Sequence, residues 1–261
     1  MAVLPAASED RQRAQALAQE LQTVMLNAGT DLRCVELFFA ALVVSGDRIA
    51  LQQCGRNAPG AVSVDFGSAG MRYRRRGGNN EDLGKAVGVK KRANLWVLDA
   101  TAGLGRDSFV LADMGCNVRL CERELLVSLL LKSGLEAAQG SEDGWLRAVS
   151  TRMQLIAGDA TEQPLSLLEN IDVIYLDPMF PQRSQSAAVK KEMALFQRLL
   201  EQGEHGTADA DALWRWAMDC DVARVVVKRP PRAPSLAASS PSHSLGGKAV
   251  RYDVYVRRGL G

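Results

Sequence analysis

The chain has 261 residues, of which 47% are hydrophobic and 24% are charged, and its formal net charge is +2. These values are typical of a globular protein with a sizeable core, and they exclude a polycation, so only local clusters could bind nucleic acid. No apolar run approaches the roughly 20 residues of a membrane-spanning helix. The N-terminal stretch 1–20 has acids and glutamines where a signal peptide would have its apolar stretch.

The cysteines and histidines point away from metal and disulfide chemistry. The five cysteines are odd in number and include no C-x-x-C pair, which argues against a zinc site or a disulfide framework. The two histidines lie in polar stretches without ligand spacing. We therefore expect a cytoplasmic protein that holds no metal ion and does not enter a membrane.

The first part of the chain, residues 1–92, is expected to form a small α+β unit. Residues 9–28 have the apolar spacing of one amphipathic helix, with Ser8 as its N-cap and Gly29 as its stop. Three β-like runs bounded by turn residues follow, over residues 35–44, 48–53 and 61–66.

A basic segment, residues 71–92, ends this unit with eight basic and two acidic residues. RNA binding needs such charges to neutralise phosphates, and the glycine pair at 77–78 would let the segment follow an RNA backbone. For any single residue, a solvated basic face explains the charge equally well. The candidate RNA contacts in this segment are Arg72, Arg74, Arg75 and Arg76.

Residues 93–261 alternate between short apolar runs and helical stretches. Strands are predicted over residues 95–99, 117–122, 153–159, 172–177 and 224–230, and helices over 106–114, 125–138, 188–201 and 209–219. This alternation indicates βαβ units, in which helices cover both faces of a parallel sheet. The last segment, 242–256, is typical of a hairpin that turns at Gly246-Gly247. The predicted fold class is α/β, a Rossmann-like methyltransferase domain with a mostly parallel sheet that ends in an antiparallel hairpin.

A glycine turn joins the first strand of this domain to the first helix. Gly103 and Gly105 allow the backbone to approach a ligand closely, and the helix that follows offers free N–H groups. Asp99 ends the strand, and Ser108 stands where a dinucleotide fingerprint has its third glycine. An acid at this place repels a pyrophosphate and attracts the sulfonium and amino groups of S-adenosylmethionine (SAM). The turn therefore favours SAM over NAD.

Acidic residues also end the next three strands. Glu122 lies where an acid can accept hydrogen bonds from both ribose hydroxyls of a nucleoside, and Asp159 is suited to accept one from the adenine amine. Asp177 ends the fourth strand. Helix capping or exposure to solvent could explain any one of these acids. Together with Asp99 they place four carboxylates at one edge of the sheet, which indicates a cofactor site there.

The stretch Asp177-Pro178-Met179-Phe180 resembles the Asn/Asp-Pro-Pro-Tyr/Phe motif of methyltransferases that modify exocyclic or amide nitrogens. A carboxylate and a backbone carbonyl that accept both N–H bonds of such an amine turn its lone pair towards the methyl group. Prolines hold these acceptors rigidly, and Phe180 can stack on the base. A tight turn with Phe180 in the core is the simpler alternative. We expect Asp177, Pro178 and Phe180 to be the catalytic residues.

Two basic residues end a later strand at the same edge. Lys228 and Arg229 follow the apolar run 225–227, so both are candidates to contact a phosphate or base of the substrate.

Several of these stretches closely resemble one known family, from about residue 35 to the end of the chain. The segments DATAGLGRDSFVLADMGCNVRLCER, VIYLDPMFP, RVVVKRP, RYDVY and VDFGSAGMRYRRRGG are similar to RsmJ, the bacterial 16S ribosomal RNA (guanine-N2)-methyltransferase family. The resemblance implies SAM as the methyl donor and a guanine of small-subunit rRNA, free or in the 30S particle, as the acceptor. The cofactor contacts that it implies are Arg106, Asp107, Glu122, Arg123, Asp159, Ala160 and Asp177, with backbone from the glycine turn.

Three alternatives are weaker. The same fold and motif could methylate a DNA base or a protein glutamine, or the chain could be an RNA-binding relative without catalysis, which the intact Asp177 and Phe180 argue against. An NAD-dependent oxidoreductase is disfavoured by Asp99 and Ser108.

Overall fold

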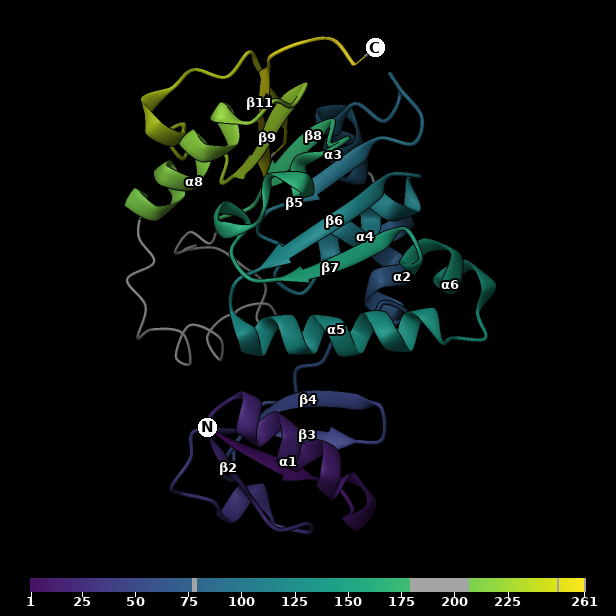
Figure 1. Ribbon diagram of the computed structural model, residues 1–261, viewed down its shortest axis with the longest axis vertical. Helices are drawn as coiled ribbons and strands as arrows, with labels where there is room; N and C mark the ends of the chain where they lie inside the picture. Colours follow the sequence, from purple (N-terminus) through teal and green to yellow (C-terminus); the bar gives the residue numbers. More distant parts are fainter. Residues whose placement is uncertain (77–78, 179–206, 248, 261) are drawn as a thin grey trace. The chain divides into compact units, whose positions relative to one another are not determined.

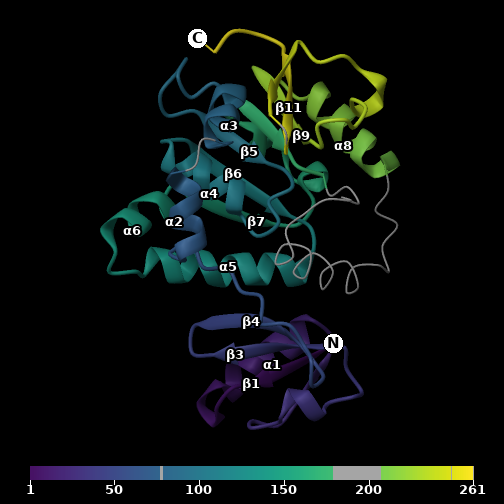
Figure 2. The ribbon, with the colours of Figure 1, turned by 180° about the vertical axis from the view of Figure 1, so that it is seen from behind.

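The computed structural model describes residues 1–76, 79–178, 207–247 and 249–260 (Figures 1 and 2). Contacts between residues divide these into two compact units. Among the described residues, the smaller unit contains Met1–Asp65 and Leu129–Ala137, and the larger unit contains the remainder. None of the helices in the described part of the chain has the length and apolar character needed to cross a bilayer.

The smaller unit is built on a four-stranded sheet of order β2-β1-β3-β4. Its elements are β1 (Ala2–Pro5), the 3-10 helix η1 (Ser8–Asp10), α1 (Arg11–Glu20), β2 (Val24–Met25), the 3-10 helix η2 (Leu32–Cys34), β3 (Ala40–Ser45) and β4 (Arg48–Gln53). Strand β1 is parallel to β2 and β3, and β4 is antiparallel to β3. Helix α1 packs on β1 and β2.

The predicted elements of this unit need three corrections. The helix expected over residues 9–28 ends at Glu20, because Gln22 takes a left-handed φ of 49° and the chain then pairs with β1 as β2. Strand β1 has only four residues, all buried, and the sequence did not indicate it. In the run 61–66 only Val62 makes a strand-like bridge, to Leu51.

The larger unit is a seven-stranded sheet of order β10-β11-β9-β8-β5-β6-β7. Its strands are β5 (Trp96–Asp99), β6 (Asn117–Glu122), β7 (Met153–Ala157), β8 (Val173–Leu176), β9 (Arg224–Arg229), β10 (His243–Gly246) and β11 (Arg251–Val256). The first five are parallel, β11 is antiparallel to β9, and β10 is antiparallel to β11. The predicted Rossmann-like sheet with a terminal hairpin is therefore confirmed.

Helices lie on both faces of this sheet. They are α2 (Ala69–Arg76), α3 (Asn79–Val87), α4 (Arg106–Asp113), α6 (Gly144–Ser150) and α8 (Thr207–Asp219), with short 3-10 turns η3 (Ala160–Glu162), η4 (Leu165–Leu168) and η5 (Leu236–Ala238). The helix α5 (Leu125–Gln139) is divided between the units, because its residues Leu129–Ala137 are grouped with the smaller one. Helix α8 lies in front of the sheet in Figure 1, and α2, α3 and α4 come forward when it is seen from behind in Figure 2. The helix expected over residues 188–201 falls outside the described residues.

The boundary expected at residue 92 differs from the division that the structure shows, which groups residues from Phe66 onward with the larger unit. The reason lies in α2, where Arg72 and Arg75 both reach Trp145, next to the N-terminal end of α6. The basic segment is thus built into the larger unit as α2 and α3, rather than ending the smaller one.

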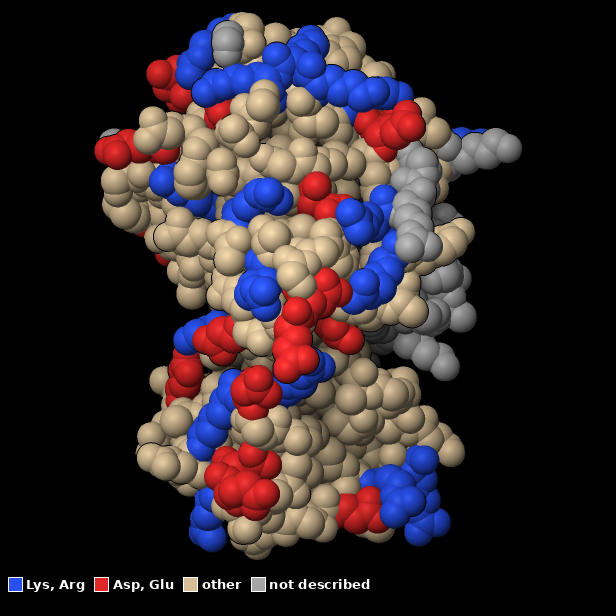
Figure 3. Space-filling model, turned by 90° about the vertical axis from the view of Figure 1, so that its right-hand side faces the viewer, with Lys and Arg blue, Asp and Glu red and all other residues tan. Residues whose placement is uncertain are grey.

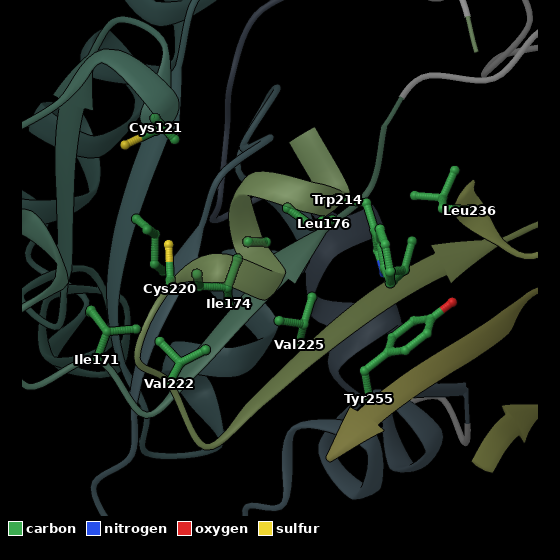
Figure 4. Close-up of a cluster of buried hydrophobic side chains, with 14 of the residues drawn as sticks. Cys121, Ile171, Ile174, Leu176, Trp214, Cys220, Val222, Val225, Leu236 and Tyr255 are labelled. Carbon is green, nitrogen blue, oxygen red and sulfur yellow. The ribbon is translucent and has the colours of Figure 1, made fainter. Parts of the chain in front are cut away.

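A buried apolar cluster fixes the two strands that precede the site. Figure 4 shows Ile174 and Leu176 of β8 and Val225 of β9 in one cluster with Trp214 of α8. The Trp214 ring meets Tyr255 edge-on, with their ring centres 5.4 Å apart. Each fully buried aliphatic side chain of this kind contributes about 1.5–3 kcal/mol to stability. This packing holds the carboxyl ends of β8 and β9 side by side.

Candidate active site

The site lies where the order of the strands reverses. Strand β5 pairs with β6 on one side and with β8 on the other, so that Asp99 lies opposite Leu120 of β6 and Tyr175 of β8. Ligands of open α/β sheets bind in the crevice beyond the strand ends at such a point. The structure brings Asp99, Glu122 and Asp177 to this edge, as the sequence predicted.

The glycine turn between β5 and α4 has the backbone that the sequence indicated. Gly103 and Gly105 have φ values of 53° and 70°, which side chains rarely adopt, and a Cβ at Gly103 would meet nothing within 4 Å. The Gly103 N–H donates to Oε2 of Glu122 at 2.7 Å. The turn therefore leaves open space beside a carboxylate, as a cradle for a nucleoside ligand requires.

The carboxylate of Asp99 holds this turn through two hydrogen bonds. It is 2% exposed, and its Oδ1 accepts the Thr101 N–H at 3.1 Å while its Oδ2 accepts the Ser108 hydroxyl. Burial raises the pKa of Asp99 from 3.8 to about 7. The carboxyl is thus shared between its neutral and ionised forms at neutral pH, so it is a weaker fixed counter-charge than the sequence suggested.

Glu122 is suited to hold a ribose. Both oxygens of this buried carboxylate accept backbone N–H groups, from Gly103 at 2.7 Å and from Glu124 at 2.8 Å. Each carboxylate oxygen can accept a second hydrogen bond, so two acceptor positions remain for two hydroxyls. Burial raises the pKa of Glu122, while these two N–H donors oppose the rise.

The end of β7 gives a looser arrangement. Oδ1 of Asp159 accepts the backbone N–H of Thr161 at 2.8 Å, so this acid caps η3. The guanidinium of Arg123 lies 3.8 Å from Asp159 and 2.8 Å from Asp209 of α8. Ala160 is buried behind them. The adenine role of Asp159 stays a prediction, as do the cofactor roles of Arg123 and Ala160.

Asp177 follows β8, and hydrogen bonds hold both its backbone and its side chain. Its N–H donates to the Thr101 hydroxyl at 2.6 Å, and Oδ2 lies 2.7 Å from Nζ of Lys228. The next residue, Pro178, is buried, whereas the Asp177 side chain is 33% exposed. The carboxylate is thus fixed and still accessible. Phe180 and Met179 lie outside the described residues.

Asp107 of α4 joins the Asp177 side of the site. Its Oδ2 accepts the Tyr175 hydroxyl at 2.7 Å and the Lys228 ammonium at 2.8 Å, and its Oδ1 pairs with Arg74 of α2. Burial raises the pKa of Tyr175, which keeps the phenol a neutral donor, and lowers the pKa of Arg74. We call Asp107, Asp177, Lys228, Tyr175 and Arg74 the ion cluster.

Comparison with known proteins identifies the family. A family model of SAM-dependent methyltransferases matches residues 26–257. A protein named ribosomal RNA small subunit methyltransferase J from Cellvibrio japonicus is 44% identical over 254 residues, which cover 95% of this chain and 94% of the relative. Its namesake from Aeromonas salmonicida is 47% identical over 224 residues, or 84% of this chain and 87% of the relative. The chain belongs to the ribosomal RNA small subunit methyltransferase J family.

A solved structure supports the same assignment. The crystal structure of a SAM-dependent methyltransferase from Neisseria gonorrhoeae has a TM-score of 0.72 and 32% identity, and the match covers 100% of this chain and 98% of that one. The expected fold, methyltransferase activity and SAM cofactor are therefore confirmed. The open glycine turn and the two free acceptor positions of Glu122 fit a nucleoside cofactor.

Asp107 has partners that the sequence did not indicate. It was expected to contact the cofactor, and that role stays a prediction, while the structure shows it bonded to two cations and a phenol within the protein. Arg106 beside it is half-buried, and its cofactor role stays a prediction. The sequence missed Tyr175 and Thr101. A tyrosine inside the apolar run VIYLD was a usable signal, since a buried hydroxyl needs a partner.

The candidate RNA contacts fall into different environments. Arg72 pairs with Asp143 at 2.6 Å and Arg75 with Asp113 at 2.8 Å, and their guanidinium groups lie 5.2 Å and 4.5 Å from the centre of the Trp145 ring. Both arginine side chains remain about half exposed, at 49% and 47%. On the face drawn in Figure 3, basic and acidic side chains are interspersed over much of the surface.

The remaining basic candidates are less accessible. Arg229 is 4% exposed and donates to the carbonyl of Pro234, so it holds the loop after β9 and does not present its charge to solvent. Its expected RNA contact is therefore corrected. Arg74 and Lys228 are engaged in the ion cluster, and the side chain of Arg76 is not among those described. Among the described residues, no group of His, Cys, Asp and Glu side chains could hold a metal ion.

Proposed function

We propose that this enzyme transfers a methyl group from SAM to the exocyclic N2 amine of a guanine in 16S rRNA, as free RNA or in the 30S particle, in the cytoplasm. Two things support the proposal: the names of relatives that cover most of the chain, and the Asp177 carboxylate, fixed at the switch point and one third exposed. The carboxylate carries the argument, because a conjugated amine is a poor nucleophile without such an acceptor.

The residues at the ends of β5 and β6 would hold the cofactor. Glu122 has acceptor positions for two ribose hydroxyls, and Gly103 leaves space for a ligand beside them. Asp159, beyond β7, remains available to the adenine amine. When bound, SAM supplies an electrophilic methyl group on a sulfonium.

Asp177 would orient the amine of the guanine. With Oδ2 on Lys228, its Oδ1 is the oxygen that can accept an N–H of the amine, and a backbone carbonyl of the Asp177-Pro178 turn can accept the other. The two bonds hold the nitrogen lone pair towards the methyl group. Once methylated, the nitrogen is cationic and loses a proton, which a carboxylate at this place can accept. Stacking of the base on Phe180 is part of the proposal and rests on the sequence.

Replacing Asp177 tests this function. Asp177→Ala should slow single-turnover methyl transfer to small-subunit rRNA by about 100- to 1000-fold at saturating SAM, because one preorganised acceptor is lost. Asp177→Asn retains an accepting oxygen without the negative charge, so it should be faster than the Ala variant and well below the parent.

The same assay separates the alternatives. If Asp177→Ala transfers methyl groups at nearly the parental rate, the motif Asp177-Pro178-Met179-Phe180 has no catalytic role and is only a turn. A parent enzyme that methylates DNA or a protein glutamine, and leaves rRNA unmodified, would replace the substrate and keep the catalytic scheme. Mapping of methylated guanines in rRNA from cells that lack the protein identifies the target position.

A further inference from the structure

Lys228 is placed differently from an ordinary surface lysine. Its Nζ lies 2.7 Å from Oδ2 of Asp177 and 2.8 Å from Oδ2 of Asp107, and its side chain is 23% exposed. Two of its three N–H donors are therefore directed at carboxylates. A lysine used only to attract RNA would keep its charge in solvent, where phosphates reach it.

The second carboxylate of this bridge is itself immobilised. Asp107 is buried, and it accepts the Tyr175 hydroxyl at 2.7 Å and pairs with Arg74 from α2. Tyr175 is completely buried in the middle strand β8, so its hydroxyl is an inflexible reference point. Lys228 therefore connects Asp177 to the rigid core through Asp107.

The contact with Lys228 also makes the two carboxylate oxygens of Asp177 inequivalent. Lys228 takes Oδ2, while the backbone N–H of Asp177 is fixed by Thr101 at 2.6 Å. A carboxylate fixed at its backbone and at one oxygen cannot rotate freely about its terminal torsion, which is otherwise broad. Oδ1 remains as the defined acceptor.

We propose that Lys228 is a positioning residue for methyl transfer, which holds Oδ2 of Asp177 against the Asp107–Tyr175 anchor and so presents Oδ1 to the substrate amine. This inference rests on the proposed role of Asp177 and deepens it. It adds no covalent step, because Lys228 acts only through its contacts with the two carboxylates.

The ammonium has a second consequence for the charge of the site. Four carboxyl groups meet at this edge, and Asp177 and Glu122 both disfavour ionisation of Asp99. Lys228 lies 2.7 Å from one oxygen of Asp177, so its positive charge offsets part of the negative charge that the strand ends bring together.

The test compares Lys228→Met, Lys228→Arg and the exposed-lysine control Lys132→Met. Single-turnover methyl transfer is measured against rRNA concentration at saturating SAM, with SAM affinity measured separately by calorimetry. Lys228→Met should slow the rate at saturating rRNA by about 10- to 100-fold, with little change in the rRNA concentration that gives half the maximal rate. SAM affinity should change less than threefold. Lys228→Arg should recover part of the rate, because the guanidinium can still donate to Oδ2 of Asp177.

Equal losses of rate in Lys228→Met and Lys228→Arg, or a loss that appears only in the affinity for SAM or rRNA, would overturn the inference. The side-chain carboxyl resonance of Asp177 in the free protein gives a second readout by NMR, because Lys228→Met should shift it and Lys132→Met should not. If the parent does not methylate rRNA, the proposed function fails, while this resonance still decides whether Lys228 holds Asp177. Should Lys228→Met not fold, Lys228→Gln removes the charge and keeps a hydrogen-bond donor.

Discussion

The two halves of the sheet edge hold the same kind of side chain in opposite ways. At the ends of β5 and β6, Asp99 and Glu122 are buried and accept hydrogen bonds from backbone N–H groups and a serine hydroxyl. At the ends of β8 and β9, Asp177 is exposed in part and is bonded to an ammonium. Asp107, from the adjacent helix, is likewise bonded to two cations and a phenol.

The difference separates two chemical tasks. A cationic nucleoside ligand brings its own positive charge, so the carboxyl groups that bind it do not need a protein cation hydrogen-bonded to them. A neutral amine brings none, and a protein cation holds its acceptor in place before the amine arrives. We therefore expect the carboxyl groups of the cofactor half to respond to pH and ligand, and the amine half to depend on its protein cation.

The largest effect expected from this comparison concerns Asp99 and the pH dependence of stability. Its folded pKa of about 7 lies above the unfolded value of 3.8, so the folded state binds more protons between these values. The free energy of unfolding should therefore fall as pH rises from about 4 to about 7, by up to about 4 kcal/mol for this group. Asp99→Asn cannot ionise and should lose this part of the dependence. Urea unfolding of both proteins across the pH range measures it.

A matched control comes from an acid with the opposite shift. A hydrogen bond from Arg33 lowers the pKa of Asp31 to about 2, so this group loses its contribution only when the pH falls towards that value. Asp31→Asn should leave the slope between pH 4 and 7 as in the parent. An Asp99→Asn protein with the parental slope would show that Asp99 is ionised in the fold, and the contrast between the two halves would disappear.

The next effect concerns the cofactor. Glu122→Ala should weaken SAM binding by about 1–3 kcal/mol, because charge-assisted hydrogen bonds to the ribose are lost. Lys228→Met should leave that affinity nearly unchanged. Calorimetry with SAM gives both values, and Glu136→Ala, an exposed glutamate of α5, is the control. Equal losses from Glu122→Ala and Lys228→Met would mean that the two halves form one site.

The cofactor half was easier to predict from the sequence than the amine half. Asp99 and Glu122 each end an apolar run, and the positions of strand ends depend on local pattern alone. The partners of Asp107 come from α2, β8 and β9, so no local pattern contains them. Arg229 shows the same limit, since its charge suggested exposure and only the fold shows that it turns inward to Pro234.

The smallest expected effect concerns RNA binding by α2, in which Arg72 and Arg75 differ from Arg74. Arg74 belongs to the ion cluster, whereas Arg72 and Arg75 lie half exposed against Trp145 and pair with Asp143 and Asp113.

If Arg72 and Arg75 bind RNA, they must exchange those carboxylates for phosphates, so each adds little net charge to the complex. Replacing both by Ala should lower the slope of log affinity against log salt by no more than about 1 to 2, since each phosphate contact contributes roughly 0.7 to 0.9. SAM affinity and single-turnover rate at saturating RNA should stay at the parental values, in contrast to Lys228→Met. Arg33→Ala removes another exposed, Asp-paired arginine and serves as the matched control. If the double variant changes the salt slope no more than Arg33→Ala does, Arg72 and Arg75 have only a structural role at Trp145. If it lowers the single-turnover rate, these two arginines contribute to the amine half of the site.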